Sequence, residues 1–438
     1  MFESLLERDQ NLKLYPALAA EMPKLVAPTT WEFKLRKGVK FHNGEDFNAD
    51  AVKFSIERLA NPANKLRGST SFAPIDRVEI VDPYAVKIHT KKPWPTFLAH
   101  IALRQASIIP PKEYAGKETA AISRNPIGTG PYKFVRWAKD EEIVMEAFPG
   151  YWAGAAKVKT VVFKPIPDDA VRVAALQNGE IDVAVNIPPH LANIIEKHPK
   201  IFLSTAPSIR TIQLMIYTHQ MDAEHKPTGP YNGPTTDKRV RQAIAYAIDA
   251  DEIIKAVMDG KAVRVATMLP SLHFGYDPSL KPIKQDLAKT KKLLADAGFP
   301  NGIDIVLNGP QGRYVRDKEV AEAVTSQLGK AGIRTTLRTY EFVNYLNNMV
   351  YVHKAGPVWL IGWGHPTMDA EAIYVPLFKS PNIFVNWHNP DFNGMVEEAP
   401  AIPLYQQIDL YGANRRLNWK ARSDELIRAY DMALKDGK

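Results

Sequence analysis

The sequence contains no cysteine among its 438 residues. That absence excludes disulfide bonds, thiolate metal sites and cysteine nucleophiles. The chain also lacks any apolar run near the ~18 residues that a membrane-spanning helix requires. We therefore expect no segment of this chain to span a membrane.

Signatures of catalysis are missing as well. The sequence has no Gly-x-Ser-x-Gly nucleophile elbow, no Gly-x-x-x-x-Gly-Lys-[Ser/Thr] phosphate loop and no His-Glu-x-x-His metal motif. The 11 histidines are dispersed, so His42, His365 and His388 are weak candidates for metal ligands. Carboxylate pairs such as Glu141-Glu142 are adjacent in the sequence, which favours a solvated surface over an acid/base couple. We predict a protein that is not an enzyme and that uses no metal and no cofactor.

Charge is only mildly unbalanced. There are 56 Lys and Arg against 48 Asp and Glu, which gives a formal net charge of +8. The basic residues are interspersed with acidic ones and form no long block, which favours a solvated basic surface and no nucleic-acid partner. A hydrophobic content of 45% with 24% charged residues is that of an ordinary soluble protein, and the length allows two or three domains.

The most informative stretch that is present runs from 125 to 151. It contains Gly128-Thr129-Gly130-Pro131-Tyr132 and, further on, Tyr151-Trp152. The glycines and prolines predict turns, with Gly128 and Gly130 supplying backbone freedom, and the residues between them predict strands. By itself this pattern fits a β-hairpin in any globular domain.

The same stretch resembles the periplasmic solute-binding proteins that serve ABC importers of peptides, nickel and opines. Further segments are similar to landmarks of that family, in the same order and over nearly the whole chain: 31–44, 49–55, 237–249, 288–298 and 402–406. The resemblance implies an α/β, two-lobe periplasmic-binding-protein type II fold with an additional β-rich subdomain in the first lobe and a hinged central cleft. It also implies capture of a peptide or another small polar ligand, delivery to an ABC permease in the inner membrane, a periplasmic location and a monomeric chain.

The pattern of residues independently favours a mixed α/β architecture. Short β-rich runs dominate the first part of the chain, and helix and strand patterns alternate after Asp168. Thr236 or Asp237 is predicted to cap one helix. A second helix is predicted after Asp317, with one apolar face, formed by Val320, Val324 and Leu328.

Two extended segments, 205–218 and 402–407, are predicted to cross between the lobes. The predicted divisions are lobe 1 at 1–208, with its β-rich subdomain around 25–145, lobe 2 at 209–402, and a return to lobe 1 at 403–438. A few crossing residues can absorb the rotation that closes a cleft. The predicted hinge residues are Gln213, Met215, Tyr217, Pro403 and Tyr405.

Arg313 is the first candidate for ligand binding, together with Tyr314 beside it. Both follow the predicted strand 303–307 and precede the helix after Asp317, and ligands bind in such loops beyond the carboxyl ends of strands. A guanidinium there can hold a carboxylate in a bidentate grip, although a surface arginine paired with a nearby acid fits the sequence too. In relatives of the resembled family, an arginine in a similar loop holds the C-terminus of a peptide.

The second candidate segment is 358–369, a predicted buried strand that runs into a Gly-rich loop. Trp359 and Trp363 would present flat apolar walls to a ligand, unless Trp359 belongs to the core and only Trp363 faces the ligand. Asp369 matches an acid that recurs in the family. His365 lies near the place where peptide-binding relatives have an aspartate for the ligand's α-ammonium group, so a standard peptide ligand is less certain.

Two departures from the family pattern are expected. Residues 1–9 show no secretory signal and resemble a point already inside the mature fold, so the signal and the first strand are expected to be absent. Residues 389–400 run directly into Ile402, so a long polar helix of the family is expected to be missing there. These departures leave open a truncated, non-transporting remnant, and a hydrolase on the same scaffold is a further alternative.

Overall fold

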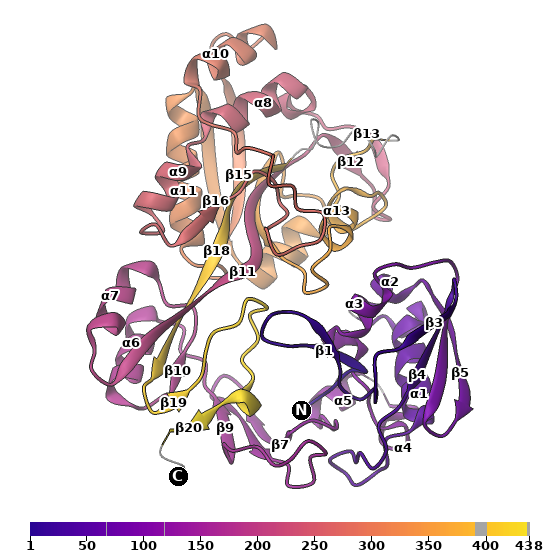
Figure 1. Ribbon diagram of the computed structural model, residues 1–438. Coiled ribbons are helices and arrows are strands. Elements are labelled where there is room, and N and C mark those ends of the chain that lie inside the picture. The colour runs from indigo at the N-terminus through magenta and orange to yellow at the C-terminus, as the bar shows by residue number, and fades with distance from the viewer. Residues whose placement is uncertain (67, 118, 390–400, 436–438) are drawn as a thin grey trace. The chain divides into compact units, whose positions relative to one another are not determined.

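The computed structural model describes residues 1–66, 68–117, 119–389 and 401–435. Their internal packing divides the chain into two compact units, which Figure 1 traces by colour along the sequence. The first unit comprises Met1–Asp168, Arg415–Trp419 and Leu426–Lys438, and the second comprises Asp169–Asn414 and Lys420–Glu425. The helix expected to be missing before Ile402 falls on residues outside the described ranges.

The first unit consists of small antiparallel sheets and short helices. Its strands pair in the orders β1-β2, β3-β4-β6-β5, β7-β8-β9 and β19-β20. They are β1 (Leu6–Arg8), β2 (Leu14–Pro16), β3 (Lys24–Ala27), β4 (Thr30–Lys34), β5 (Ile75–Asp82), β6 (Ala85–Thr90), β7 (Tyr132–Ala138), β8 (Glu142–Ala147), β9 (Thr160–Phe163), β19 (Leu417–Asn418) and β20 (Ala433–Leu434). Its helices are α1 (Ala49–Ala60), α2 (Ser69–Phe72), α3 (Phe97–Ile101), α4 (Pro111–Tyr114) and α5 (Thr119–Arg124).

Helix α1 shows how local sequence sets these elements. Asn48 precedes the helix, and its side-chain oxygen accepts the Ala51 N–H at 3.1 Å, which satisfies one of the unpaired donors of the first turn. Val52, Ile56 and Leu59 recur at helical spacing and are buried in one hydrophobic core with residues of the four-stranded sheet.

The Gly-Thr-Gly segment of the first unit lies against the start of the chain. The Gly130 N–H donates to the Met1 carbonyl oxygen at 2.8 Å. A Cβ at Gly128 or Gly130 would lie 2.4 or 2.7 Å from that same oxygen, and neither glycine has a positive φ. The prediction that these glycines supply backbone freedom is therefore wrong, because what the structure requires of them is the close approach of another backbone.

The side chains of the same motif converge on Glu3, which is 5% exposed. Its carboxylate accepts hydrogen bonds from Thr129 Oγ1 at 2.8 Å, Tyr151 Oη at 2.7 Å and Trp152 Nε1 at 3.2 Å. Burial raises the pKa of Glu3, and the donated hydrogen bonds act in the opposite direction. The motif that carries the family resemblance thus anchors the N-terminal residues within the first unit.

The second unit contains a seven-stranded mixed sheet with the strand order β10-β18-β11-β17-β15-β16 and with β14 paired to β18. Its strands are β10 (Val183–Ala184), β11 (Ile201–Ile216), β14 (Ala262–Arg264), β15 (Ile303–Gln311), β16 (Ile333–Glu341), β17 (Val358–Trp363) and β18 (Ala401–Asn414), beside the separate pair β12 (His219–Met221) and β13 (Pro227–Pro230). Its helices are α6 (Asp169–Asn178), α7 (Pro189–Lys197), α8 (Lys238–Ala247), α9 (Ala250–Ala256), α10 (Leu287–Asp296), α11 (Asp317–Lys330), α12 (Phe342–Tyr345), the π-helical η4 (Leu346–Val350) and α13 (Glu371–Phe378).

Two helices of the second unit begin where the sequence predicts. Asp237 precedes α8, and its carboxylate accepts the Arg239 N–H at 2.8 Å. Helix α11 begins at Asp317 and lies along β15 and β16 (Figure 1). The predicted apolar face of α11 is confirmed, because its members are all 0% exposed: Val320, Val324 and Leu328.

The central strand β11 is buried on both faces from Thr211 to Ile216. Ile212, Leu214 and Ile216 belong to a core shared with α8 and α11. Met215 points into a second core, which also contains Trp359 of β17. Thr211 and Gln213, on that second face, are each 0% exposed. The alternation along β11 therefore predicts the strand but does not separate a buried face from a solvent face.

The predicted hinge residues lie inside this sheet or at its edge. Gln213 and Met215 pair with β17 and β18, and Tyr217 directly follows β11. Pro403 and Tyr405 belong to β18. The predicted lobe boundaries at 208 and 402 fall within these strands, and a hinge at these positions stays a prediction.

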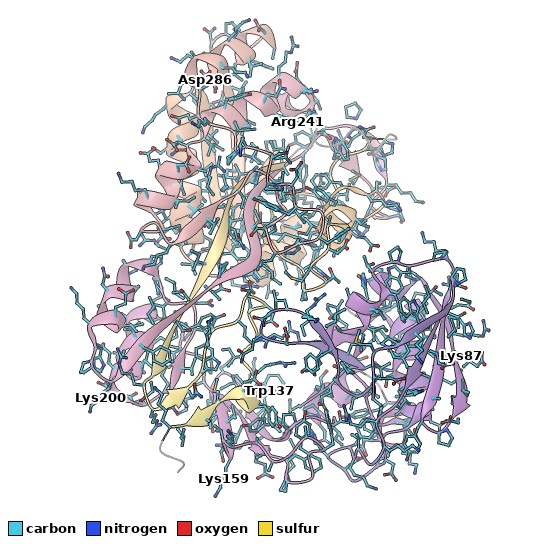
Figure 2. All side chains as sticks on the ribbon, in the orientation of Figure 1. Lys87, Trp137, Lys159, Lys200, Arg241 and Asp286 are labelled. Carbon is cyan, nitrogen blue, oxygen red and sulfur yellow. The ribbon has the colours of Figure 1, made fainter. Side chains whose placement is uncertain are left out.

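Charged side chains are spread over many elements, as their dispersion in the sequence suggests. Lys87 on β6 and Lys159 before β9 belong to the first unit (Figure 2). Lys200, Arg241 and Asp286 belong to the second, where Asp286 caps α10 by accepting the Lys289 N–H at 2.8 Å.

Candidate functional site

The loop between β15 and α11 is held by a carboxylate from the start of the helix. Asp317 is 4% exposed and accepts the backbone N–H groups of Gly312 at 2.9 Å, Arg313 at 2.9 Å and Tyr314 at 3.0 Å. Burial raises the pKa of Asp317, and the hydrogen bonds from these N–H groups lower it in turn. The backbone that carries Arg313 is therefore fixed at the carboxyl end of a parallel strand pair.

The Arg313 side chain is half-buried between aromatic rings. Its guanidinium carbon lies 5.2 Å from the ring centroid of Tyr314 and 5.3 Å from that of Phe342. Within the described residues, this guanidinium has no hydrogen-bond or ion-pair partner. Burial lowers the pKa of Arg313, and the nearby Arg210 guanidinium lowers it further. The alternative of an arginine paired with a neighbouring acid does not describe this side chain.

A second arginine, which the sequence analysis did not identify, lies on the same tyrosine. The Arg210 guanidinium carbon is 5.4 Å from the Tyr314 ring centroid, and Arg210 Nη2 is 2.6 Å from Glu425 Oε2. Glu425 also accepts a hydrogen bond from the Ser208 hydroxyl. The charge of Arg210 is thus balanced within the protein, whereas the neighbouring Arg313 has no bonded counter-charge in the part of the chain that the structure describes.

The end of β17 completes this group of side chains. Tyr314 Oη donates to the Gly362 carbonyl oxygen at 3.1 Å. A Cβ at Gly362 would lie 2.7 Å from Arg210 Cδ and 2.8 Å from Tyr314 Cε1, so only glycine leaves room for both neighbours. The structure therefore brings together three parts of the sequence: Arg210, the Arg313–Tyr314 loop and the Gly-rich end of β17.

The two tryptophans of β17 have different environments. Trp359 is 1% exposed and belongs to the hydrophobic core, as the alternative interpretation of the sequence had it. Trp363 is partly exposed, donates its indole N–H to the Ala372 carbonyl oxygen at 3.1 Å and packs edge-on against Phe384 at 4.8 Å. Only Trp363 has a ring surface to offer to a ligand.

The loop that follows β17 is held partly by its own polar groups. His365 Nδ1 lies 3.0 Å from Thr367 Oγ1, and Asp369 Oδ1 accepts the Glu371 N–H at 2.9 Å at the start of α13. Asp369 also forms a parallel bridge with Phe274, which is 78% exposed. His365 and Asp369 are partly exposed.

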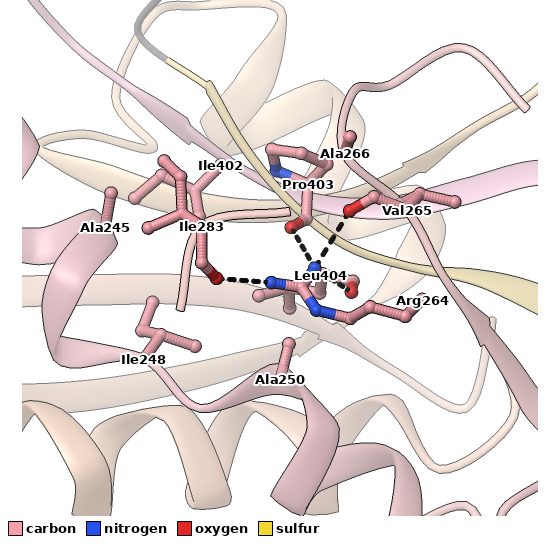
Figure 3. A pocket seen from close by; sticks show the side chains of 10 residues that line it. All are labelled: Ala245, Ile248, Ala250, Arg264, Val265, Ala266, Ile283, Ile402, Pro403 and Leu404. Carbon is pink, nitrogen blue, oxygen red and sulfur yellow. Dashed lines mark hydrogen bonds between the residues drawn. The ribbon is translucent and has the colours of Figure 1, made fainter. Parts of the chain in front are cut away.

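Two cavities contain charged side chains that already have partners. One in the second unit measures about 20 Å³, the space of a single water molecule. Its Arg264 donates to the carbonyl oxygens of Val265 at 2.9 Å, Leu404 at 3.0 Å and Ile283 at 2.9 Å (Figure 3). The cavity is too small for a ligand, and its arginine joins β14 to β18.

The other cavity lies in the first unit and measures about 350 Å³. Its volume is within the range of small-molecule sites. However, Glu3 in its wall is bonded as described above, and Arg428 is paired with Glu7 and with the Tyr15 hydroxyl. Glu3 and Arg428 therefore stabilise the first unit and are already engaged with protein partners.

Comparisons with known proteins identify the family of this chain. The profile described as "Bacterial extracellular solute-binding proteins, family 5 Middle" matches residues 13–384. A glutathione-binding protein, GsiB, from Pectobacterium atrosepticum is 32% identical over 407 residues, which cover 92% of this chain and 75% of that protein.

Solved structures show the same fold. NikZ from Campylobacter jejuni, in complex with Ni(L-His), superposes with a TM-score of 0.85 at 25% identity, covering 99% of this chain and 93% of that one. The periplasmic binding protein DppA from Helicobacter pylori, in complex with the peptide STSA, superposes with a TM-score of 0.84 at 23% identity, covering 99% and 92%. The predicted type II periplasmic-binding-protein fold is confirmed. Among the described residues, no helix combines the length and apolar character needed to cross a bilayer.

Proposed function

This chain belongs to the bacterial extracellular solute-binding proteins of family 5, and from that premise we propose that it captures a small anionic ligand through the Arg313 guanidinium. Proteins of this family are the substrate-binding components of ABC importers, and this chain is such a component rather than an enzyme. It binds a small ligand for delivery to a membrane permease.

The observation that carries the proposal is the environment of Arg313. A half-buried guanidinium without a hydrogen-bonded counter-charge has lost part of its hydration and gained no partner in return. A ligand carboxylate can supply that partner in a bidentate grip. Asp317 already orders this loop through its hydrogen bonds to the backbone of Arg313 and Tyr314, so ligand binding loses less conformational entropy there.

The proposed site includes the surfaces around that guanidinium. We assign Arg313 and Trp363 to direct ligand contact, and we keep His365 and Asp369 as polar groups of the same site. Tyr314 is 6% exposed and supports the Arg313 guanidinium with its ring. Trp359 supports the site from the core, because it is 1% exposed. One charged grip and aromatic contacts are enough for micromolar affinity, which corresponds to about −8 kcal/mol.

The ligand class that we propose is a short peptide or peptide-like molecule with a free carboxylate. Glutathione is the first compound to test, since the relative that is 32% identical over most of this chain is a glutathione-binding protein. Members of the family act outside the cytoplasm, and we propose that this protein works in the periplasm as a monomer.

Calorimetry on purified protein tests this proposal. Arg313→Ala should weaken the binding of glutathione by about 2 to 4 kcal/mol, and Arg313→Lys should recover only part of that loss, because it keeps the charge but not the planar fork. The matched control is Arg338→Ala, which removes an exposed arginine from β16 and should leave the affinity unchanged.

The ligand itself can be identified by mass spectrometry of what co-purifies and is released on unfolding. If the bound compound has no anionic group, or if Arg313→Ala and the parent bind it equally, Arg313 does not grip the ligand.

A further inference from the structure

Two histidines of the second unit meet at a place that the proposed ligand site does not use. His225 lies in the turn between β12 and β13, and His353 follows the π-helical segment η4. His225 Nδ1 is 2.9 Å from His353 Nε2, with ring centroids 5.1 Å apart and ring planes at 67°. Both rings are partly exposed. The two residues are 128 positions apart in the chain, so no local sequence motif predicts that they are neighbours.

The hydrogen bonds around His353 define which of its nitrogens holds the proton. Asn386 Nδ2 faces the Phe384 carbonyl oxygen at 3.5 Å, which leaves Asn386 Oδ1 as the acceptor 2.9 Å from His353 Nδ1. His353 Nδ1 therefore carries the hydrogen, and the lone pair of Nε2 faces His225.

The spacing of the two nitrogens fits a particular coordination geometry. Ligands ~2.05 Å from a metal ion lie ~2.9 Å apart in adjacent square-planar or octahedral positions and ~3.3 Å apart in a tetrahedral site. In the metal-free chain the 2.9 Å between His225 Nδ1 and His353 Nε2 is a hydrogen bond, in which His225 Nδ1–H donates to the Nε2 lone pair. The same separation suits adjacent ligands of the first kind once the hydrogen of His225 has moved to its Nε2. Square-planar and octahedral sites with imidazole ligands are typical of Cu²⁺ and Ni²⁺.

The surroundings favour a cation and hold both rings in place. The negative charge of Asp222 acts on His353, and one Asp222 oxygen accepts the N–H groups of Glu224 at 3.0 Å and Lys226 at 2.8 Å. The turn is closed further by the His225 N–H, which donates to the Asp222 carbonyl oxygen at 3.1 Å. The acceptor on the far side of His353, Asn386, is the kind of outer partner that orients a metal-ligating histidine.

We propose that His225 and His353 form a two-imidazole site for a divalent Cu²⁺ or Ni²⁺ ion, with water in the remaining coordination positions. Among the described residues, no group of three or more His, Asp or Glu side chains is arranged to hold a metal ion, so the protein supplies two ligands here. Such a site exchanges its ion readily. It does not depend on the ligand proposed for Arg313.

Titration of the full chain with CuCl₂ and with NiCl₂, in a buffer that does not bind metals, tests the site. One equivalent of Cu²⁺ should bind to the parent, and His225→Ala and His353→Ala should each lose it. Asn386→Ala should weaken the binding by about tenfold, because the orientation of His353 is lost. His198→Ala, which removes a partly exposed histidine elsewhere in the same unit, is the matched control and should bind as the parent does.

Electron paramagnetic resonance of the parent with one equivalent of Cu²⁺ provides a readout that needs no variant. Two equivalent imidazole nitrogens in the copper plane are the expected result. A spectrum without nitrogen ligands, or equal Cu²⁺ affinity in the parent and in both histidine variants, would overturn the proposal.

Discussion

A buried charge in the first unit and a half-buried charge in the second have opposite environments. In the first unit the Glu3 carboxylate accepts three side-chain hydrogen bonds, and Arg428 is paired with Glu7. In the second unit the half-buried Arg313 guanidinium rests on aromatic rings and has no such partner within the described residues. A charge whose partners are all internal stabilises the fold, whereas a charge left without one is available to a ligand. This contrast is our reason to assign Glu3 to the stability of the fold and to propose Arg313 for ligand binding, and it requires no bound molecule.

Glu3→Ala should give the largest change in stability. The substitution leaves the hydroxyls of Thr129 and Tyr151 and the indole N–H of Trp152 without their acceptor, at a cost of about 3 to 5 kcal/mol in the free energy of unfolding. Urea denaturation followed by circular dichroism measures this loss. Glu21→Ala, which breaks an exposed ion pair with Lys34, should shift the midpoint very little. Equal effects of the two substitutions would remove the anchor role of Glu3.

Asp409 offers a prediction of pH dependence within the second unit. Burial and, next, the neighbouring Glu425 carboxylate raise its pKa to about 6, against the lowering effects of Gln407, Arg210 and Ser208. The folded-state pKa lies above the unfolded value of about 4, so the ionised form opposes folding, and stability falls as the pH rises from about 4 through 6.

Asp409→Asn removes this titration and keeps an acceptor for Gln407, which donates to Asp409 Oδ1 at 2.6 Å. At pH 7.5 the variant should be more stable than the parent by about 2 kcal/mol, and the difference should disappear below about pH 4. Thermal melts across that range measure both limits. A difference that does not change with pH would mean that Asp409 does not titrate in this window.

Arg313→Met should have the smallest effect on stability, and of the opposite sign to Glu3→Ala. Methionine covers the rings of Tyr314 and Phe342 without an unpaired charge, so the free energy of unfolding should rise by up to about 1 kcal/mol. The same variant should lose anionic ligand. A clear loss of stability in the melt would show that the guanidinium has a structural partner after all, and the contrast between the units would fail.

Much of the second unit could be predicted from the sequence because its signals are local. The cap at Asp237 defines the start of α8, and the spacing of apolar residues defines α11. The loop that carries Arg313 follows from the order of these elements along the chain. Arg210 and Glu425 could not be predicted in the same way. They are 215 residues apart, and only the fold places them together beside Tyr314.

Two interpretations show where pattern alone is insufficient. Trp359 and Trp363 share one face of β17, and because both faces of the sheet are buried, alternation could not tell which ring is in the core. A glycine in Gly128-Thr129-Gly130 can be required either by its backbone conformation or by the close approach of another part of the backbone. The sequence suggested the first, and the 2.8 Å contact with Met1 establishes the second for Gly130.

The clasp made by Asp317 has a consequence for how ligand preference can change during evolution. The shape of the loop depends on a carboxylate and on main-chain N–H groups, and on the glycine at 312 with its φ of +79°, but not on the side chain at 313. The side chain at position 313 can therefore be replaced without a change in the conformation of the loop. Under the function proposed for Arg313, a lineage that exchanged the residue there would change the charge of the solute that it binds and would inherit the rest of the scaffold unaltered.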